Sequence, residues 1–208
     1  MNPLSLRTCL VEPVPAVFEG ARMLDAAVTA HLENRIDDAR ALFHDSNAKA
    51  VRDWTESLWG GKSERFRVSP KIVRAPFNPE DLDKSRMLPK KLRDELIKID
   101  GRHCRFCGIP VIRAEVRTKI RRLECYRDVI PWGKKNSMQH AAFQAMWLQY
   151  DHIVPHSLGG PSTVENMVIT CAPCNFGRME NTLAEFGLLN PRDRKRQESS
   201  WDGLERFK

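Results

Sequence analysis

Apolar residues recur every three or four positions between Val14 and about Gly60, and helix breakers are nearly absent there. This spacing predicts α-helices. Three apolar sets each share one helical face: Val17, Ala21, Leu24 and Val28; Ile36, Ala39 and Phe43; and Val51, Trp54 and Leu58. Asn34 and residues 45–47 interrupt the pattern, so we expect two or three short antiparallel helices. The segment 1–60 is interpreted as a helical subdomain that is either a structural cap or a docking surface for a protein partner.

The pattern changes in residues 61–88, where glycines, prolines and alternating charges replace the helical spacing. We expect a linker here, with a short strand at Phe66–Val68 or Ile72–Val73. Pro89 then begins a predicted helix of sequence PKKLRDELIKID, which leads into the motif GRHCRFCG. The expected organisation is therefore a helical subdomain at 1–60, a linker at 61–88, a main domain at 89–190 and a basic tail at 191–208.

Residues 108–149 consist of two different halves. The first, VIRAEVRTKIRRLECYRDVI, predicts a basic helix whose cationic face, with Arg117, Arg121 and Arg122, either contacts phosphates or is simply solvated. The second, NSMQHAAFQAMWLQY, predicts a buried helix that starts at Asn136 or Ser137, because it is apolar on nearly all sides. Its larger apolar side chains, Met138, Phe143, Met146 and Trp147, are interpreted as packing residues, and His140 as a satisfied core histidine.

The C-terminal part is predicted to hold a short amphipathic helix, MENTLAEFGLLNP, ended by glycine and proline. The charged tail that follows carries Trp201, Leu204 and Phe207. Because a purely solvated tail would lack such side chains, we expect its end to fold back and dock on the protein.

Four of the six cysteines form two Cys-x-x-Cys pairs: Cys104, Cys107, Cys171 and Cys174. Two such pairs can place four thiolates in a tetrahedron around Zn²⁺, and a site closed by four protein ligands is structural. A redox dithiol is the alternative for each pair. Cys9 and Cys125 are interpreted as ordinary thiols.

The charge is distributed unevenly along the 208 residues, which carry a net charge of +7. Residues 1–60 have 6 Lys and Arg against 9 Asp and Glu, whereas residues 61–208 have 28 against 18. The basic excess therefore accompanies the cysteine motifs, which favours a polyanionic partner such as nucleic acid. No signal peptide and no membrane-spanning run is apparent, so we expect a cytoplasmic protein without a membrane partner.

Candidate chemistry is concentrated in YDHIVPHSLGGPSTVENMVITCAPCNFGR, residues 150–178. Phosphodiester hydrolysis requires a hard cation with oxygen ligands and a base for the attacking water. Asp151 and Asn175 offer such oxygens, and His152 suits the base at neutral pH. A glycine pair at 159–160 permits a tight turn, and the Asn166 side chain could hold the loop in place.

This stretch resembles the ββα-metal motif of HNH endonucleases, in the variant that carries zinc-binding Cys-x-x-Cys pairs. The resemblance covers roughly residues 101–180 and implies an α+β, predominantly helical fold with a ββα-metal core on a four-cysteine zinc site. It also implies Asp151 and Asn175 as ligands of Mg²⁺ or Mn²⁺, His152 as general base, and Asn166 as the residue that orients the loop. Arg178 stands where the family more often has lysine and can still contact phosphate. The family varies at the position of His156, which is a spare ligand, a phosphate contact or a surface residue, and we favour a supporting role.

We therefore expect a metal-dependent endonuclease that hydrolyses DNA phosphodiester bonds. The alternative is a catalytically idle zinc module that binds nucleic acid or bridges proteins. A further hypothesis makes the protein a nuclease effector in phage defence or restriction, controlled by a partner that docks on residues 1–60. The choice between DNA and RNA, strandedness, sequence or modification specificity and oligomeric state stay open.

Overall fold

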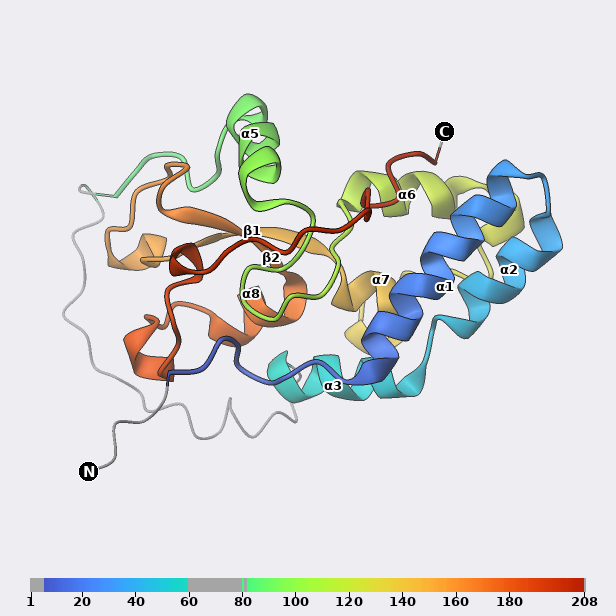
Figure 1. Ribbon diagram of the computed structural model, residues 1–208, viewed down its shortest axis with the longest axis horizontal. Helices are drawn as coiled ribbons and strands as arrows, with labels where there is room; N and C mark the ends of the chain where they lie inside the picture. Colours follow the sequence, from blue (N-terminus) through green and yellow to red (C-terminus); the bar gives the residue numbers. More distant parts are fainter. Residues whose placement is uncertain (1–5, 60–79, 81, 208) are drawn as a thin grey trace.

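The computed structural model describes residues 6–59, 80 and 82–207 (Figure 1). The α-helices are α1 Pro15–Leu32, α2 Ile36–Asp45, α3 Lys49–Trp59, α5 Lys90–Asp100, α6 Ala114–Arg122, α7 Ala141–Ala145 and α8 Ala172–Arg178. The strands are β1 Leu148–His152 and β2 Met167–Cys171. Short 3-10 turns occur at Glu124–Tyr126, Asn136–Met138, His156–Leu158, Ala184–Phe186 and Pro191–Asp193. Helices thus predominate around one small antiparallel sheet, an α+β arrangement; the strand expected at 66–68 or 72–73 lies outside the described residues.

The helical prediction for the N-terminal segment is confirmed by α1, α2 and α3. Pro15 occupies the first turn of α1, where its missing N–H is not needed. Asn34 adopts a left-handed conformation with φ of 61° between α1 and α2, which reverses the chain. The predicted apolar faces are the buried ones, apart from the half-buried Ile36, and α1 packs along α2.

The N-terminal helices share one hydrophobic core with the rest of the described chain. Helix α3 contacts both α7 and α8, and Phe43 of α2 makes an edge-to-face contact with Tyr126 at 5.0 Å between ring centroids. The C-terminal segment runs back across the molecule to α1, where Phe207 stacks on His31 at 4.4 Å (Figure 1). Leu204 and Phe207 are buried, so the predicted docking of the tail is confirmed.

Two predicted helices are shorter in the structure than the sequence pattern suggests. Helix α7 spans five residues and begins only after His140, whose Nδ1 accepts a hydrogen bond from the Phe143 N–H. After α7 the chain is extended, because Ile112 forms backbone hydrogen bonds with Met146 and Leu148 on either side of Trp147. This extended segment leads into β1. Met138 is 54% exposed, so its interpretation as a packing residue was wrong. The predicted helix after residue 178 is reduced to the 3-10 turn Ala184–Phe186, beside which Arg7 exchanges backbone bonds with Gly187 and Leu189.

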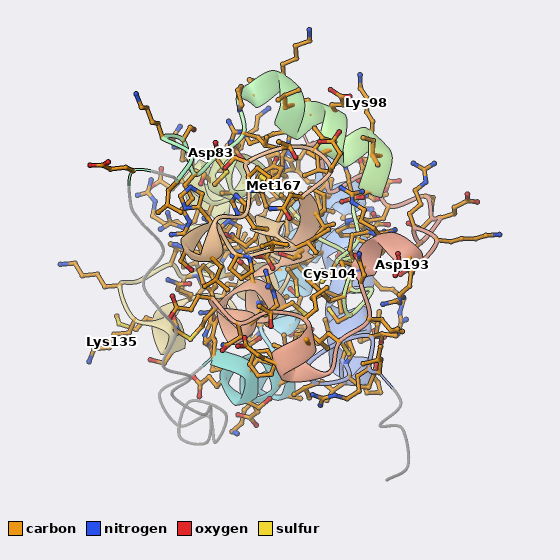
Figure 2. The ribbon with its side chains drawn as sticks, turned by 90° about the vertical axis from the view of Figure 1, so that its left-hand side faces the viewer. Asp83, Lys98, Cys104, Lys135, Met167 and Asp193 are labelled. Carbon is orange, nitrogen blue, oxygen red and sulfur yellow. The ribbon has the colours of Figure 1, made fainter. Side chains whose placement is uncertain are left out.

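The sheet and the helix after it form a ββα unit. Strand β1 pairs antiparallel with β2, with Asp151 opposite Val168 and His152 opposite Met167. Strand β2 is buried along its whole length, contacts α5 and α8, and runs directly into α8. Figure 2 shows Met167 and Cys104 in the interior, whereas Lys98 and Lys135 extend outward from the surface. In the part of the chain that the structure describes, no helix has the length and hydrophobicity to span a bilayer.

Candidate functional site

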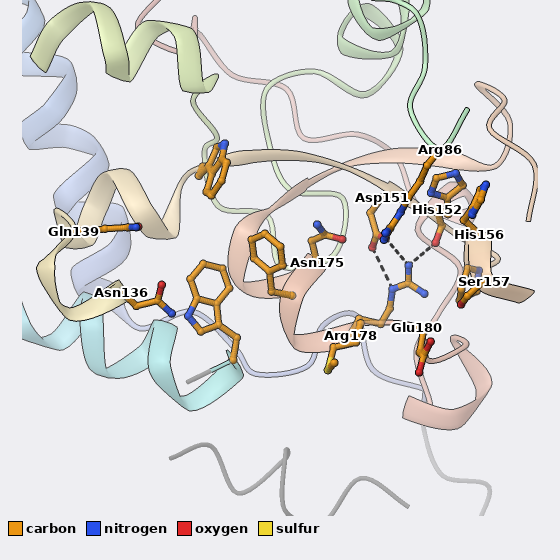
Figure 3. A pocket seen from close by; sticks show the side chains of 15 residues that line it. Arg86, Asn136, Gln139, Asp151, His152, His156, Ser157, Asn175, Arg178 and Glu180 are labelled. Carbon is orange, nitrogen blue, oxygen red and sulfur yellow. Dashed lines mark hydrogen bonds and ion pairs between the residues drawn. The ribbon is translucent and has the colours of Figure 1, made fainter. Parts of the chain in front are cut away.

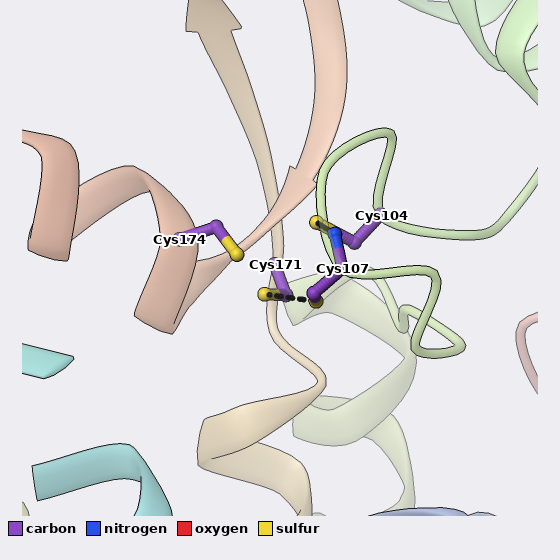
Figure 4. A group of neighbouring side chains, drawn as sticks. All are labelled: Cys104, Cys107, Cys171 and Cys174. Carbon is purple, nitrogen blue, oxygen red and sulfur yellow. Dashed lines mark hydrogen bonds between the residues drawn. The ribbon is translucent and has the colours of Figure 1, made fainter. Parts of the chain in front are cut away.

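Two segments far apart in the sequence bring the four cysteines of the Cys-x-x-Cys pairs together (Figure 4). Cys104 and Cys107 lie on a tight turn after α5, in which the Cys104 N–H donates to the Ile109 carbonyl and Gly108 has a positive φ of 78°. Cys171 ends β2, and Cys174 lies in the first turn of α8. All four sulfur atoms lie within 4.8 Å of one another.

This cysteine cluster could hold a metal ion. A tetrahedral Zn²⁺ with Zn–S bonds of about 2.3 Å places its sulfurs roughly 3.8 Å apart, and the Cys107 and Cys171 sulfurs are 3.5 Å apart. Burial raises the pKa of the Cys107 thiol well above its usual value, so a deprotonated cluster needs a cation to compensate its charge. Cys9 and Cys125 are free thiols outside the cluster.

Asp151 and His152 end strand β1, and the Asp151 carboxylate is buried in an ion pair with Arg178. The Arg178 Nε lies 3.1 Å from one carboxylate oxygen of Asp151, and an η-nitrogen lies 2.6 Å from the other. Arg178 also donates to the backbone carbonyls of His152, Ile153 and Asn181. Burial raises the pKa of the Asp151 carboxyl, and the charge of Arg178 opposes that shift.

The phosphate contact predicted for Arg178 does not fit this geometry. The side chain is 1% exposed, and its donors are engaged by Asp151 and by three backbone carbonyls. Arg178 instead ties the C-terminal end of α8 to the end of β1. The sequence did not indicate that Asp151 is the partner of Arg178.

His152 lies at hydrogen-bond distance from a serine that the sequence analysis did not single out. Its Nε2 is 3.0 Å from the Ser162 hydroxyl. Burial, followed by the nearby charges of His156 and Arg86, lowers the pKa of His152 to about 4. The imidazole is therefore neutral at pH 7 and able to accept a proton.

Asp83, from the predicted linker, also contacts this loop, and no sequence signal indicated it. The backbone carbonyl of Asp83 is 3.0 Å from Nε2 of His156, and its carboxylate accepts a hydrogen bond of 2.6 Å from the Ser162 N–H. His156 is thus held beside His152, with ring centroids 5.5 Å apart. A residue of the predicted linker therefore helps to position the candidate base.

Asn166 holds together the loop between β1 and β2. Its amide nitrogen donates to the carbonyls of Val154 (3.1 Å) and Pro161 (2.9 Å), and its Oδ1 accepts from the Val154 N–H at 3.0 Å. Gly160 lies close to the backbone of Val154, and a Cβ at this position would be 1.8 Å from the Val154 carbonyl oxygen. Asn166 therefore joins the two sides of the loop, and its role in orienting the catalytic residues stays a prediction.

A cavity of about 710 Å³ brings five of the predicted site residues together (Figure 3). The predicted residues that line it are Asp151, His152, His156, Asn175 and Arg178. Asn175 projects from α8, and its amide nitrogen lies 3.4 Å from Oε1 of Gln149. Carboxylate, imidazole and amide groups therefore converge on one hollow.

The predicted basic residues of α6 do not line this cavity. Arg117 is buried, with its guanidinium 3.5 Å from the Trp132 ring centroid and 5.1 Å from that of Trp147. Burial lowers its pKa to about 10. The phosphate contact predicted for Arg117 is therefore wrong, because this side chain packs into the protein; Arg121 is half-buried and Arg122 exposed.

Comparison with known families agrees with this geometry. Residues 138–178 match the family model described as HNH endonuclease. The chain thus carries an HNH domain that contains β1, β2 and α8. No curated protein and no solved structure gives a match. Cys104 and Cys107 lie outside the matched residues, and the fold nevertheless places them against Cys171 and Cys174.

Proposed function

We propose that the protein is a metal-dependent endonuclease that hydrolyses phosphodiester bonds in DNA. The observation that carries this proposal is the meeting of Asp151, His152 and Asn175 at one cavity, within the segment that matches the HNH family. These groups supply hard oxygen ligands and a neutral base, which are the requirements of metal-assisted phosphodiester hydrolysis. The net charge of +7 favours a polyanionic substrate.

We assign structural Zn²⁺ to the four clustered cysteines, because the distances between their sulfurs suit a closed tetrahedral site. Mg²⁺ or Mn²⁺ would be held by Asp151 and Asn175. A carboxylate has about four lone-pair sites, so the two bonds from Arg178 leave Asp151 able to ligate a cation. The Asn175 amide nitrogen faces Gln149, which leaves its oxygen for the ion. Such an ion supplies charge stabilisation at the phosphate.

The residues of the chain perform the proton transfer and the positioning. His152 is neutral at pH 7 and takes the proton of the attacking water, while Ser162 orients its ring. A phosphate that enters beside His156 and Arg86 adds negative charge near His152, which favours its protonated form. Asn166 holds the loop together, so that His152 and the metal ligands keep their relative positions.

One observation favours the alternative of a catalytically idle zinc module. The Asp151 carboxylate already has a cationic partner in Arg178, as a purely structural carboxylate would. Control by a partner that docks on residues 1–60, as in a phage-defence or restriction effector, stays a prediction.

The deciding experiment compares wild type with His152→Ala on supercoiled plasmid, in zinc-loaded protein with and without added Mg²⁺ or Mn²⁺. We expect metal-dependent nicking or linearisation, reduced about 10²–10⁴-fold in the variant because the general base is lost. His44→Ala is the matched control, since His44 is exposed and lies on α2. Equal cleavage by wild type and His152→Ala would contradict the proposal, as would a wild type inactive on plasmid and on single-stranded DNA.

A further inference from the structure

The cavity continues beyond the hydrolytic residues into an aromatic end. Figure 3 shows Asp151 and His152 on one side, Asn136 and Gln139 on the other, and Asn175 between them. The aromatic residues in its lining are Trp59, Trp147 and Phe176. The Phe176 ring centroid lies 4.7 Å from that of Trp59 and 6.1 Å from that of Trp147. The hydrolytic mechanism uses none of these rings.

At the aromatic end, Trp147 is held by packing contacts, whereas Phe176 is partly exposed to solvent. Trp147 packs on Trp132 at 6.3 Å, and Arg117 lies over both indole rings. These contacts fix the orientation of Trp147 before any ligand binds. Phe176 is nevertheless 39% exposed, although it is a large apolar side chain beside a polar site. The cavity volume of about 710 Å³ lies within the roughly 300–1,000 Å³ usual for ligand pockets.

Helix α8 contributes neighbouring residues to the hydrolytic end and to the aromatic end of the cavity, so the two ends lie about one nucleotide apart. Asn175 and Phe176 are consecutive residues, and both line the cavity. A phosphate held near Asn175 therefore places its attached nucleoside close to Phe176. Every nucleobase has a π-face that can stack on an aromatic ring, whereas a base inside an intact duplex is already covered by its neighbours.

Polar groups at the aromatic end suit the edge of a base. Asn136 and Gln139 both line it. The Gln139 amide nitrogen donates to the Gly133 carbonyl at 3.2 Å. Among the described residues no hydrogen bond engages its Oε1 or the Asn136 side-chain amide, so these groups are free to meet base donors and acceptors.

We propose that the aromatic end of the cavity is a subsite for an unstacked nucleobase. The preferred substrate then carries an unpaired nucleotide next to the scissile phosphate, as in a single strand, a bubble or a flipped base. This inference rests on the proposed nuclease function, because it assigns the neighbouring end of the cavity to the phosphate.

The test measures binding by fluorescence anisotropy, so it does not depend on cleavage. Zinc-loaded His152→Ala protein without added Mg²⁺ or Mn²⁺ is titrated with a labelled single strand and with an abasic sugar-phosphate strand of equal length and charge. We expect the strand with bases to bind more tightly. Adding Trp59→Ala should weaken its binding about 5–150-fold, the range for loss of one base-stacking contact. The abasic strand should bind unchanged, and Trp59→Phe should preserve the preference.

Phe176→Ala provides a second variant, because Phe176 is partly exposed and its truncation opens no core cavity. It decides the question if Trp59→Ala does not fold. Equal affinity for the two strands would overturn the subsite, as would a preference for bases that survives the loss of the ring. In that case metal-dependent plasmid cleavage by wild type would still uphold the nuclease. A preference for bases without metal-dependent cleavage of plasmid or of single-stranded DNA by wild type would instead refute the nuclease and leave a nucleobase-binding cavity.

Discussion

The Asp151 side chain has a structural role, as the buried partner of Arg178, and a proposed catalytic role as a metal ligand. The carboxylate is buried at the end of β1, and Arg178 compensates its charge with two hydrogen bonds. Removing one member of such a pair leaves an uncompensated buried charge. We expect Arg178→Ala to lower the free energy of unfolding by about 3–5 kcal/mol, measured by chemical denaturation of the zinc-loaded protein.

Lys90→Ala is the matched control for this prediction. Lys90 pairs with Asp94 at the surface, where its side chain is 80% exposed. Because exposed pairs contribute little, this variant should lose no more than about 0.5 kcal/mol. Equal losses in Arg178→Ala and Lys90→Ala would show that Asp151 does not depend on its buried partner.

His140 gives a prediction about pH and stability. Burial lowers its pKa to about 4, below the unfolded value of about 6.5. Between these values the unfolded chain binds more protons than the folded one, so stability falls as the pH drops from 6.5 towards 4. The loss attributable to His140 reaches about 3 kcal/mol across this window.

His140→Asn is the variant that isolates this effect. Asparagine can still cap α7 but does not titrate, and it leaves the cysteines and the other histidines in place. The free energy of unfolding, measured at pH 7 and pH 4.5, should fall more in wild type than in His140→Asn. Parallel losses in the two proteins would exclude His140 as the source.

Residue identity was easier to predict from the sequence than side-chain direction. Asp151, His152 and Asn175 could be selected because their types and spacing fit one chemistry. Nothing in the spacing indicates that Arg178 turns back to Asp151, or that Arg117 lies against two indole rings, since such directions depend on tertiary packing. Ser162 and Asp83 were missed because serines and aspartates are common in loops.

At the scale of elements, the loop between the strands depends on one close backbone approach. A Cβ at Gly160 would meet the Val154 carbonyl oxygen at 1.8 Å and the Asn166 amide at 2.9 Å. Since a backbone atom cannot yield easily, Gly160→Ala must displace the loop that carries Ser162. We expect a loss of about 1–3 kcal/mol, typical of overpacking, together with a large loss of cleavage because His152 loses its hydrogen-bonded neighbour.

Gly187→Ala tests whether this effect is specific to the loop. Gly187 has φ of 60°, and a Cβ there meets nothing within 4 Å. Its substitution costs only the left-handed conformation, about 1–2 kcal/mol, and should leave the cleavage rate unchanged. Thermal unfolding and plasmid cleavage of both variants provide the comparison; normal cleavage by Gly160→Ala would contradict the role given to the loop.

The predicted elements agree with the structure where local signals are strong and depart from it where tertiary bonds decide. α1 to α3 follow their apolar spacing closely. The segment around α7 has an equally apolar sequence, yet it becomes a short helix and a strand because β2 and Ile112 offer backbone partners. Local periodicity contains no information about those partners.

At the scale of the whole molecule, long-range contacts join segments that the sequence suggests are separate. Arg40 of α2 holds Asp128 at 2.7 Å, and Arg206 holds Asp25 of α1 at the same distance. Leu58 of α3 packs against Gly177 of α8, where a Cβ would meet the Leu58 carbonyl oxygen at 3.1 Å. Helix α3 therefore covers one face of α8, the helix that carries Asn175 and Phe176.

This arrangement predicts that the fragment 61–208 does not fold by itself. Removing α1 to α3 exposes the apolar surfaces of α7 and α8, and α8 carries the cavity residues Asn175, Phe176 and Arg178. Circular dichroism should show no cooperative unfolding transition for this fragment, and plasmid cleavage should be absent. Full-length protein with Arg22→Ala serves as control, since Arg22 is exposed on α1. A folded, active fragment would instead make residues 1–60 a separable unit and would count against control by a partner that docks on them.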